Sequence, residues 1–209
     1  MITMKRFSIS LMLGLVFLGL SSCSDNKDTP QPVEVKSVTI NASDYSKFAY
    51  FSFETGKVVE ISDAEAKSSG AWDIAFRGHY PRTNSGKSGN GKGGVIKTNK
   101  LSFDEVKSIP AGGKWTVDEE MKVPKADASG RPIMPPVYET ITGNVLLKSW
   151  LKSSGRPPHK YDNSIFLVKG ANGKIAKVQL LSLEKKGSDG KPVNGYVTLK
   201  YEYPFQPGK

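Results

Sequence analysis

The chain has 209 residues, with 30 Lys and Arg against 20 Asp and Glu, two histidines and one cysteine. A single cysteine excludes a disulfide scaffold, a zinc ribbon and a cluster of thiolate ligands, and two histidines leave little room for a histidine-rich metal centre. With 37% hydrophobic residues the chain is too apolar to be disordered throughout, and it has no second apolar run that could span a membrane. The length after an export signal suits one domain better than two.

The first 22 residues have the three parts of a secretory signal peptide: a positive end at Lys5 and Arg6, a short apolar stretch, and small residues. The apolar stretch, 11–20, is too short to cross a hydrocarbon core of about 30 Å. The residues that end at Cys23 fit a bacterial lipobox, in which the cysteine receives lipid and becomes the new N-terminus. An ordinary signal with a chance cysteine is the alternative. Removing the signal leaves 28 basic residues against 20 acidic ones, a net charge of +8 instead of +10.

We therefore expect three parts: a lipoprotein signal peptide (1–22), a lipidated Cys23 with a flexible tether (23–34), and a single β-rich domain (35–209). The tether is polar and contains prolines, and the acidic residues after the cysteine resemble the surface-export signal of Bacteroidetes lipoproteins. This predicts a protein held on the membrane by its lipid anchor, at the outer membrane and exposed on the cell surface. Such a protein could also be shed in soluble form.

The folded part shows short runs typical of strands, separated by turn residues. The early candidates are Val35–Ile40, Phe48–Phe53, Lys57–Ile61, Trp72–Phe76 and Gly94–Thr98. Near the C-terminus, Ile165–Lys169 and Ile175–Leu181 flank an Asn-Gly turn, which accepts the positive φ angles of a tight hairpin. Apolar and polar residues then alternate over Tyr196–Tyr203. These three runs predict an antiparallel meander.

Helix signals are few and short. Ser62 and Ser102 each precede a glutamate by three residues, the spacing of a capping box, but no long amphipathic run follows either one. The run Val145–Leu151 fits a helix or a buried strand equally well. Two proline- and glycine-bearing stretches, Lys122–Pro136 and Ser153–Asn163, do not fit central strands and are predicted to be long ordered loops. The fold class is therefore all-β, antiparallel, with one or two short helices.

A glycine-rich segment, Asn84–Gly94, invites comparison with phosphate-binding loops. Its stretch from Gly86 to Lys92 matches the start of the P-loop pattern, but Gly93 stands where a Ser or Thr should hold magnesium. A strand-like run follows where the P-loop needs a helix N-terminus to face the phosphate. We therefore expect a tight loop between strands.

Catalytic and nucleic-acid-binding patterns are missing. The sequence contains neither H-E-x-x-H nor G-x-S-x-G, and its cysteine is assigned to lipid. Asp118, Glu119 and Glu120 are consecutive acids, which we interpret as a solvated charge run. The lysines are scattered, without an arginine-rich face, so they do not indicate nucleic acid. We expect a binding protein and not an enzyme.

Met134 and His159 lie in the two predicted loops. A thioether and a neutral imidazole are both axial ligands for haem iron. Covalent attachment of haem would need C-x-x-C-H, which the chain lacks, so any haem would be held by ligation and burial. The alternative is that Met134 packs against a small apolar cluster and His159 is an exposed loop residue.

Several blocks together resemble the HmuY family of haem-binding lipoproteins. The resemblance extends from about Val38 to Pro204 and preserves the order and spacing of the blocks. They are Trp72–Phe76, Arg82–Gly86, Gly93-Gly94, Ile141–Gly143, Trp150-Leu151, Phe166–Gly173, Lys177–Gln179 and Thr198–Pro204. No single block is diagnostic, and the ordered set behind a lipobox carries the resemblance.

The resemblance implies an antiparallel β domain in which two long loops form a haem cleft. Family members hold the iron between two axial side chains, a histidine pair in some and methionines in others. Here the loops offer Met134 and His159, with His79 as a lesser candidate; His159 is offset by a few residues from the histidine-type position.

The resemblance also implies a function. The chain would be a haemophore that captures free haem, or haem from host haem proteins, and passes it to a TonB-dependent outer-membrane haem receptor. The cofactor would be non-covalent iron protoporphyrin IX. The alternative is a surface lipoprotein that binds a glycan or a protein partner without haem.

Overall fold

The computed structural model describes residues 34–127, 130–131, 133–153 and 158–208. The predictions for the signal peptide, the lipidation of Cys23 and most of the tether lie outside these residues. Along the described chain, no helix is both long and apolar enough to cross a membrane.

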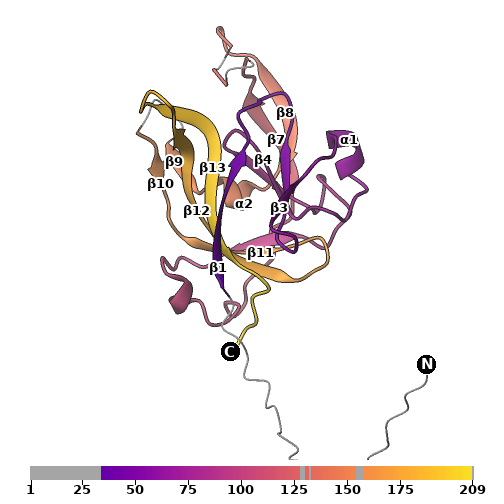
Figure 1. Ribbon diagram of the computed structural model, residues 1–209. Helices are drawn as coiled ribbons and strands as arrows, with labels where there is room; N and C mark the ends of the chain where they lie inside the picture. The colour runs from indigo at the N-terminus through magenta and orange to yellow at the C-terminus, as the bar shows by residue number, and fades with distance from the viewer. Residues whose placement is uncertain (1–33, 128–129, 132, 154–157, 209) are drawn as a thin grey trace, which may run out of the picture. The chain divides into compact units, whose positions relative to one another are not determined.

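A five-stranded antiparallel sheet forms one layer of the fold (Figure 1). Its strand order is β1-β13-β12-β11-β6, which makes β1 and β6 the edges. The strands are β1 (Val35–Asn41), β6 (Gly94–Lys97), β11 (Ile165–Lys169), β12 (Ile175–Lys186) and β13 (Pro192–Glu202). The predicted C-terminal meander is confirmed, because β11 pairs with β12 and β12 with β13.

A second antiparallel sheet has the strand order β3-β2-β4-β5. Its strands are β2 (Ala49–Ser52), β3 (Lys57–Val59), β4 (Ile74–Arg77) and β5 (Tyr80–Thr83). Two separate hairpins complete the β structure: β7 (Glu119–Pro124) with β8 (Tyr138–Gly143), and β9 (Leu151–Ser153) with β10 (Lys160–Tyr161). The described fold is thus mostly antiparallel β, as predicted.

The main core lies between the two sheets. In β4, Ile74 and Phe76 belong to this core, whereas Ala75 belongs to a second cluster with Trp72 and Val123. This is the period of two expected for a strand covered on both faces. The first four residues of β11 are all apolar for the same reason: Phe166 and Val168 face the main core, while Ile165 and Leu167 pack in a third cluster with Phe205.

Both predicted capping boxes are confirmed. Ser62 caps α1 (Asp63–Ala66) together with Glu65, and Ser102 caps a 3₁₀ turn (Phe103–Glu105) together with Glu105. The run Val145–Leu151, which fitted a helix or a strand, begins as the helix α2 (Val145–Lys148). Leu151, the last residue of the run, is the first residue of β9.

Parts of the two stretches predicted to be loops are strands. Lys122–Pro124 form the end of β7, which pairs only with β8 among the described residues. Pro124 is the last residue of the strand, a position where the missing N–H of proline is tolerated. In the second stretch, Ser153 belongs to β9 and Lys160–Tyr161 form β10. Residues 154–157 of that stretch, which include Gly155 and Arg156, are outside the described residues.

Candidate functional site

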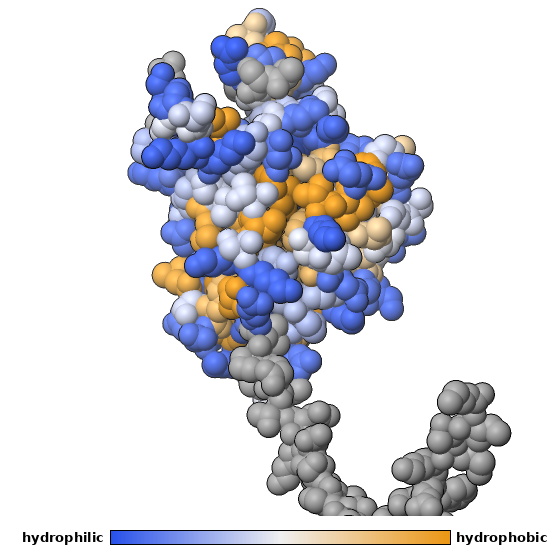
Figure 2. Space-filling view, viewed as in Figure 1, coloured by the Kyte–Doolittle hydropathy of each residue, from blue (hydrophilic) through white to orange (hydrophobic). Residues whose placement is uncertain are grey.

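Two hairpins project from the same end of the fold. One is β7–β8; the other is β9–β10, which lies beside the ends of β12 and β13 (Figure 1). The space-filling view shows the surface hollowed between these two projections (Figure 2). The two stretches that the sequence predicted as loops therefore lie at one end of the molecule and face a common recess.

The β7–β8 projection exposes apolar side chains. Met134 is 76% exposed, Tyr138 63% and Val137 48%. The backbone beneath them is ordered by hydrogen bonds, since Lys125 N–H donates to the Val137 carbonyl over 2.7 Å and Ile133 N–H donates to the Lys125 carbonyl over 3.0 Å. The thioether of Met134 is therefore accessible on a structured ribbon.

Tyr45 attaches this ribbon to the body of the protein. Its ring lies where a Cβ would be on both Gly78, in the β4–β5 turn, and Gly130, in the β7–β8 connection. Both glycines have positive φ, 54° and 79°, a region that other residues rarely adopt. Burial raises the pKa of the Tyr45 hydroxyl. The ring thus fills a slot that exists only because both neighbours are glycine.

His159 is buried on the opposite projection. Its side chain is 2% exposed, and its Nε2 lies 3.3 Å from Asn194 Oδ1 and 3.2 Å from Glu184 Oε1. With the proton on Nε2, the ring donates to Asn194, while the buried Nδ1 has no hydrogen-bond partner among the described residues. Ligating histidines commonly have this arrangement, with one N–H oriented by a protein oxygen and the other nitrogen unoccupied.

His79 lies in the same neighbourhood as His159. The indole N–H of Trp150 donates to the His79 carbonyl over 3.3 Å, Trp150 stacks on Tyr161 with centroids 5.5 Å apart, and the Tyr161 ring meets His159 edge-on. Burial, together with the Lys148 and His159 charges, lowers the pKa of His79 to about 4. His79 is consequently a neutral imidazole at physiological pH.

The three predicted ligands, Met134, His159 and His79, differ in their position and burial. The two histidines share one aromatic cluster, whereas Met134 stands exposed on the other hairpin. Met134 and His159 therefore have different surroundings. Among the described residues, no group of three or more His, Cys, Asp or Glu side chains could hold a bare metal ion.

Asp162 fastens the β9–β10 projection to the five-stranded sheet. Its carboxylate lies 3.0 Å from Lys97 Nζ of β6 and 3.2 Å from Lys152 Nζ of β9. Burial alone would raise the pKa of Asp162, but a hydrogen bond from Ser164 and the two ammonium groups lower it to about 2.

The glycine-rich segment is a packing feature, and the expectation of a tight loop ahead of a strand is confirmed. It wraps around the fully buried Asn84, whose Nδ2 donates to the Ser69 and Trp72 carbonyls and whose Oδ1 accepts from Gly91 N–H at 3.0 Å. A Cβ on Gly91 would meet Asn84 Oδ1 at 2.8 Å. The loop then enters β6, so the P-loop geometry has no counterpart here.

The interpretation of Asp118 as part of a solvated charge run is wrong. Asp118 is 1% exposed, and its carboxylate accepts from Thr83 N–H at 2.8 Å, from the Thr83 hydroxyl at 2.6 Å and from Asn144 Nδ2 at 3.0 Å. Burial raises the pKa of Asp118, and the hydrogen bonds from Thr83 oppose that rise.

Asp73 has a similar structural role. It accepts from Phe53 N–H at 2.8 Å and Ala171 N–H at 2.9 Å, which ties the end of β2 to the β11–β12 turn. Burial raises the pKa of its carboxyl group. No sequence pattern indicates either role, because the donors come from segments far apart in the chain.

Comparison with known proteins gives a consistent result. The HmuY protein family matches residues 44–201. A candidate HmuY-like heme binding protein from Bacteroides vulgatus is 28% identical, with a TM-score of 0.63 over 83% of this chain and 94% of its own. No curated protein matches the chain.

Two further solved structures share the fold at lower identity. A candidate lipoprotein from Bacteroides fragilis is 21% identical, with a TM-score of 0.61 over 85% of this chain and 93% of its own. The apo form of an HmuY analog from Tannerella forsythia is 23% identical, with a TM-score of 0.57 over 81% of this chain and 97% of its own.

Proposed function

Because this chain belongs to the HmuY family, we propose that it is a lipid-anchored haemophore, which binds haem without a covalent bond and passes it to a TonB-dependent outer-membrane haem receptor. The observation that carries the proposal is the recess between the two projecting hairpins, in a fold shared at 28% identity with a candidate HmuY-like heme binding protein. The protein would make and break no covalent bond.

The exposed apolar side chains of the β7–β8 ribbon support this proposal. Met134, Val137 and Tyr138 stand in water at a cost in free energy that burial against a flat apolar ligand would recover, at about 25 cal/mol for each Å² removed from water. Ligand sites of this kind are mostly apolar, with few polar groups. A porphyrin face is a ligand of this shape and chemistry.

We propose Met134 and His159 as the axial ligands of the haem iron. The Met134 thioether is accessible as it stands. His159 has the free Nδ1 that a ligand needs, and Asn194 can hold its Nε2–H, but the ring must first become accessible to the iron. Ligation by His159 would therefore require the β9–β10 projection to move so that the ring becomes exposed.

His79 is the second choice for the histidine ligand. It is neutral because its pKa is about 4, and it lies in the same aromatic cluster as His159. If His159 serves only to hold the β9–β10 projection closed, His79 remains a competent imidazole nearby.

Titration with haemin, followed by the Soret band, tests the proposal. We expect saturation at one haemin per chain, with a ligated spectrum that changes in Met134→Ala and again in His159→Ala. Because thioether sulfur prefers ferrous iron, we expect tighter binding after reduction with dithionite. If His79→Ala alters the spectrum and His159→Ala does not, the ligand is His79. If the wild-type chain gives no Soret change, the proposed function is wrong.

A further inference from the structure

One side of the fold leaves two strand edges unpaired. Among the described residues, β1 pairs only with β13 at the edge of the five-stranded sheet, and β3 pairs only with β2 at the edge of the four-stranded sheet. Figure 1 shows β1 and β3 running on the same side of the molecule, and β1 contacts β2. Free N–H and C=O groups on such edges can pair with another extended chain.

Two cavities lie between these edges. One, of about 510 Å³, is lined by Asn41 and Ala42 at the end of β1, by Phe48–Tyr50 at the start of β2, and by the consecutive residues Val58–Ile61. The other, of about 480 Å³, is lined by Glu34–Val38 and by Thr55 and Gly56 of the β2–β3 turn. Val58 and Val59 belong to β3, and Glu60 and Ile61 continue the chain beyond its end, so the cavity extends along the last residues of β3 and past them. We call these two cavities together the edge groove.

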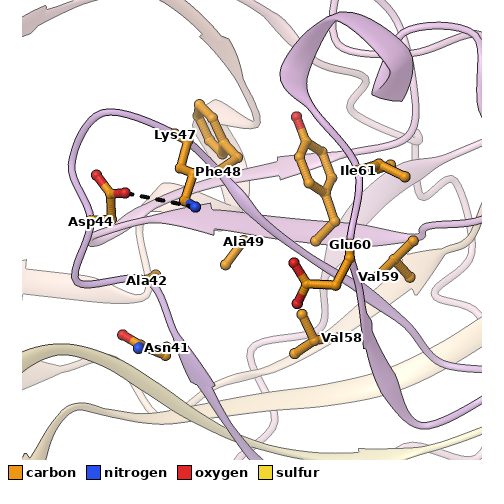
Figure 3. A pocket seen from close by; sticks show the side chains of 11 residues that line it. Asn41, Ala42, Asp44, Lys47, Phe48, Ala49, Val58, Val59, Glu60 and Ile61 are labelled. Atoms are coloured by element: carbon orange, nitrogen blue, oxygen red, sulfur yellow. Dashed lines mark ion pairs between the residues drawn. The ribbon is translucent and has the colours of Figure 1, made fainter.

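The larger cavity of the edge groove has apolar walls. Val58 is 44% exposed, and Figure 2 shows hydrophobic residues gathered in the middle of this face of the molecule. In the close-up, Val58 points into the cavity from β3, opposite Ala42 and Asn41 (Figure 3). The groove therefore combines unpaired backbone edges with apolar side chains, the two features used in strand addition.

One unpaired charge lies in the larger cavity. Asp44 and Lys47 form an ion pair at 3.9 Å, whereas Glu60 is exposed and has no ion pair or side-chain hydrogen bond with the residues that the structure describes. The Glu60 carboxylate extends toward the middle of the cavity (Figure 3). In a chain with a formal net charge of +10, this acidic position favours a cationic group on whatever binds here.

We infer that the edge groove binds an extended segment of another polypeptide, in which apolar side chains alternate with polar ones and a Lys or Arg reaches Glu60. Backbone pairing with β1 or β3 would supply affinity, and Val58 and Glu60 would select the side chains. The chain's own tether, 24–33, is a poor occupant because Val33 is its only aliphatic residue and two of its residues are prolines. This inference is independent of haem binding.

A synthetic peptide tests the inference. The probe is an acetylated, amidated nine-residue peptide of alternating valine and threonine with one central lysine; the comparison peptides carry glutamate at the centre, or N-methyl groups on alternate amides. The target is the mature chain with Cys23→Ser, labelled with ¹⁵N and titrated by NMR. We expect the lysine peptide to shift amides of β1 and β3 and to bind at least tenfold more tightly than the glutamate peptide. The N-methylated peptide should not bind.

Variants identify the contact. Glu60→Gln should weaken the lysine peptide severalfold, and Glu60→Lys should reverse the preference between the two peptides. Asp104→Asn, which alters an exposed carboxylate outside the groove and outside both projecting hairpins, should change neither, and all variants should titrate with haemin as the wild type does. The inference is overturned if both peptides bind equally, if the shifted amides lie outside β1 and β3, or if peptide addition shifts residues 24–33, which would mean that the tether occupies the groove.

Discussion

Replacing Asp162 with Asn should destabilise the protein at neutral pH and not in strong acid. The folded-state pKa of about 2 lies below the ordinary value of 3.8, so the charged carboxylate stabilises the fold above pH 3.8, and this contribution is lost as the pH falls from 3.8 to about 2. A difference of nearly two pKa units corresponds to about 2.4 kcal/mol at 1.36 kcal/mol per unit. Lys152 is 59% exposed and screened by solvent, which reduces our expectation to about 1–2 kcal/mol.

Urea unfolding at pH 7 and near pH 2 measures this difference. The free energy of unfolding of Asp162→Asn should fall below that of the wild type by about 1–2 kcal/mol at pH 7, and the two should converge near pH 2. Lys97→Met should lose more stability than Lys152→Met, because Lys97 is only 20% exposed. Asp104→Asn, which changes an exposed carboxylate without an ion pair, serves as the control. A loss in Asp162→Asn that is the same at both pH values would refute the reasoning.

Two other substitutions test the buried contacts. Asp118→Ala leaves up to three buried donors without an acceptor, so we expect a loss of about 3–9 kcal/mol in urea unfolding, at about 1–3 kcal/mol per donor. Asp118→Asn should lose less, and equal losses would contradict the hydrogen-bond account. Tyr45→Ala should empty the slot beside Gly130, lower the free energy of unfolding by about 1–2 kcal/mol and speed hydrogen exchange in β7 and β8. Tyr45→Phe should behave as the wild type. Unchanged exchange in Tyr45→Ala would show that Tyr45 does not attach the β7–β8 ribbon to the body of the protein.

Patterns that depend on a few neighbouring residues predicted structure well. The capping boxes at Ser62 and Ser102, the Asn-Gly turn and the period-two alternation all act locally, and each has its expected structure. Strand β5 escaped prediction because Pro81 interrupts its pattern, and a proline is tolerated there because β5 is an edge strand. Strand β12 is five residues longer than predicted because its register shifts near Ser182 disturb the alternation.

The two stretches that carry the proposed ligands could be singled out from the sequence, but the surroundings of their side chains could not. Their proline and glycine content alone distinguished the two stretches from the strand-like runs, and both lie at one end of the fold (Figure 1). The burial of His159 depends on Glu184 and Asn194, which come from the extended β12–β13 hairpin. Asp118 likewise acquires its donors from β5 and from Asn144. Such contacts between distant segments leave no periodic trace in the sequence.

Amide chemical-shift mapping with gallium protoporphyrin, a diamagnetic analogue of haem, tests the central claim most directly. The account predicts one site per chain, with the largest shifts in residues 125–143, around His159, and at the ends of β12 and β13, and none in β1 or β3. Shifts centred elsewhere, or no saturable change at one equivalent, would contradict the claim that haem is held between the two projecting hairpins.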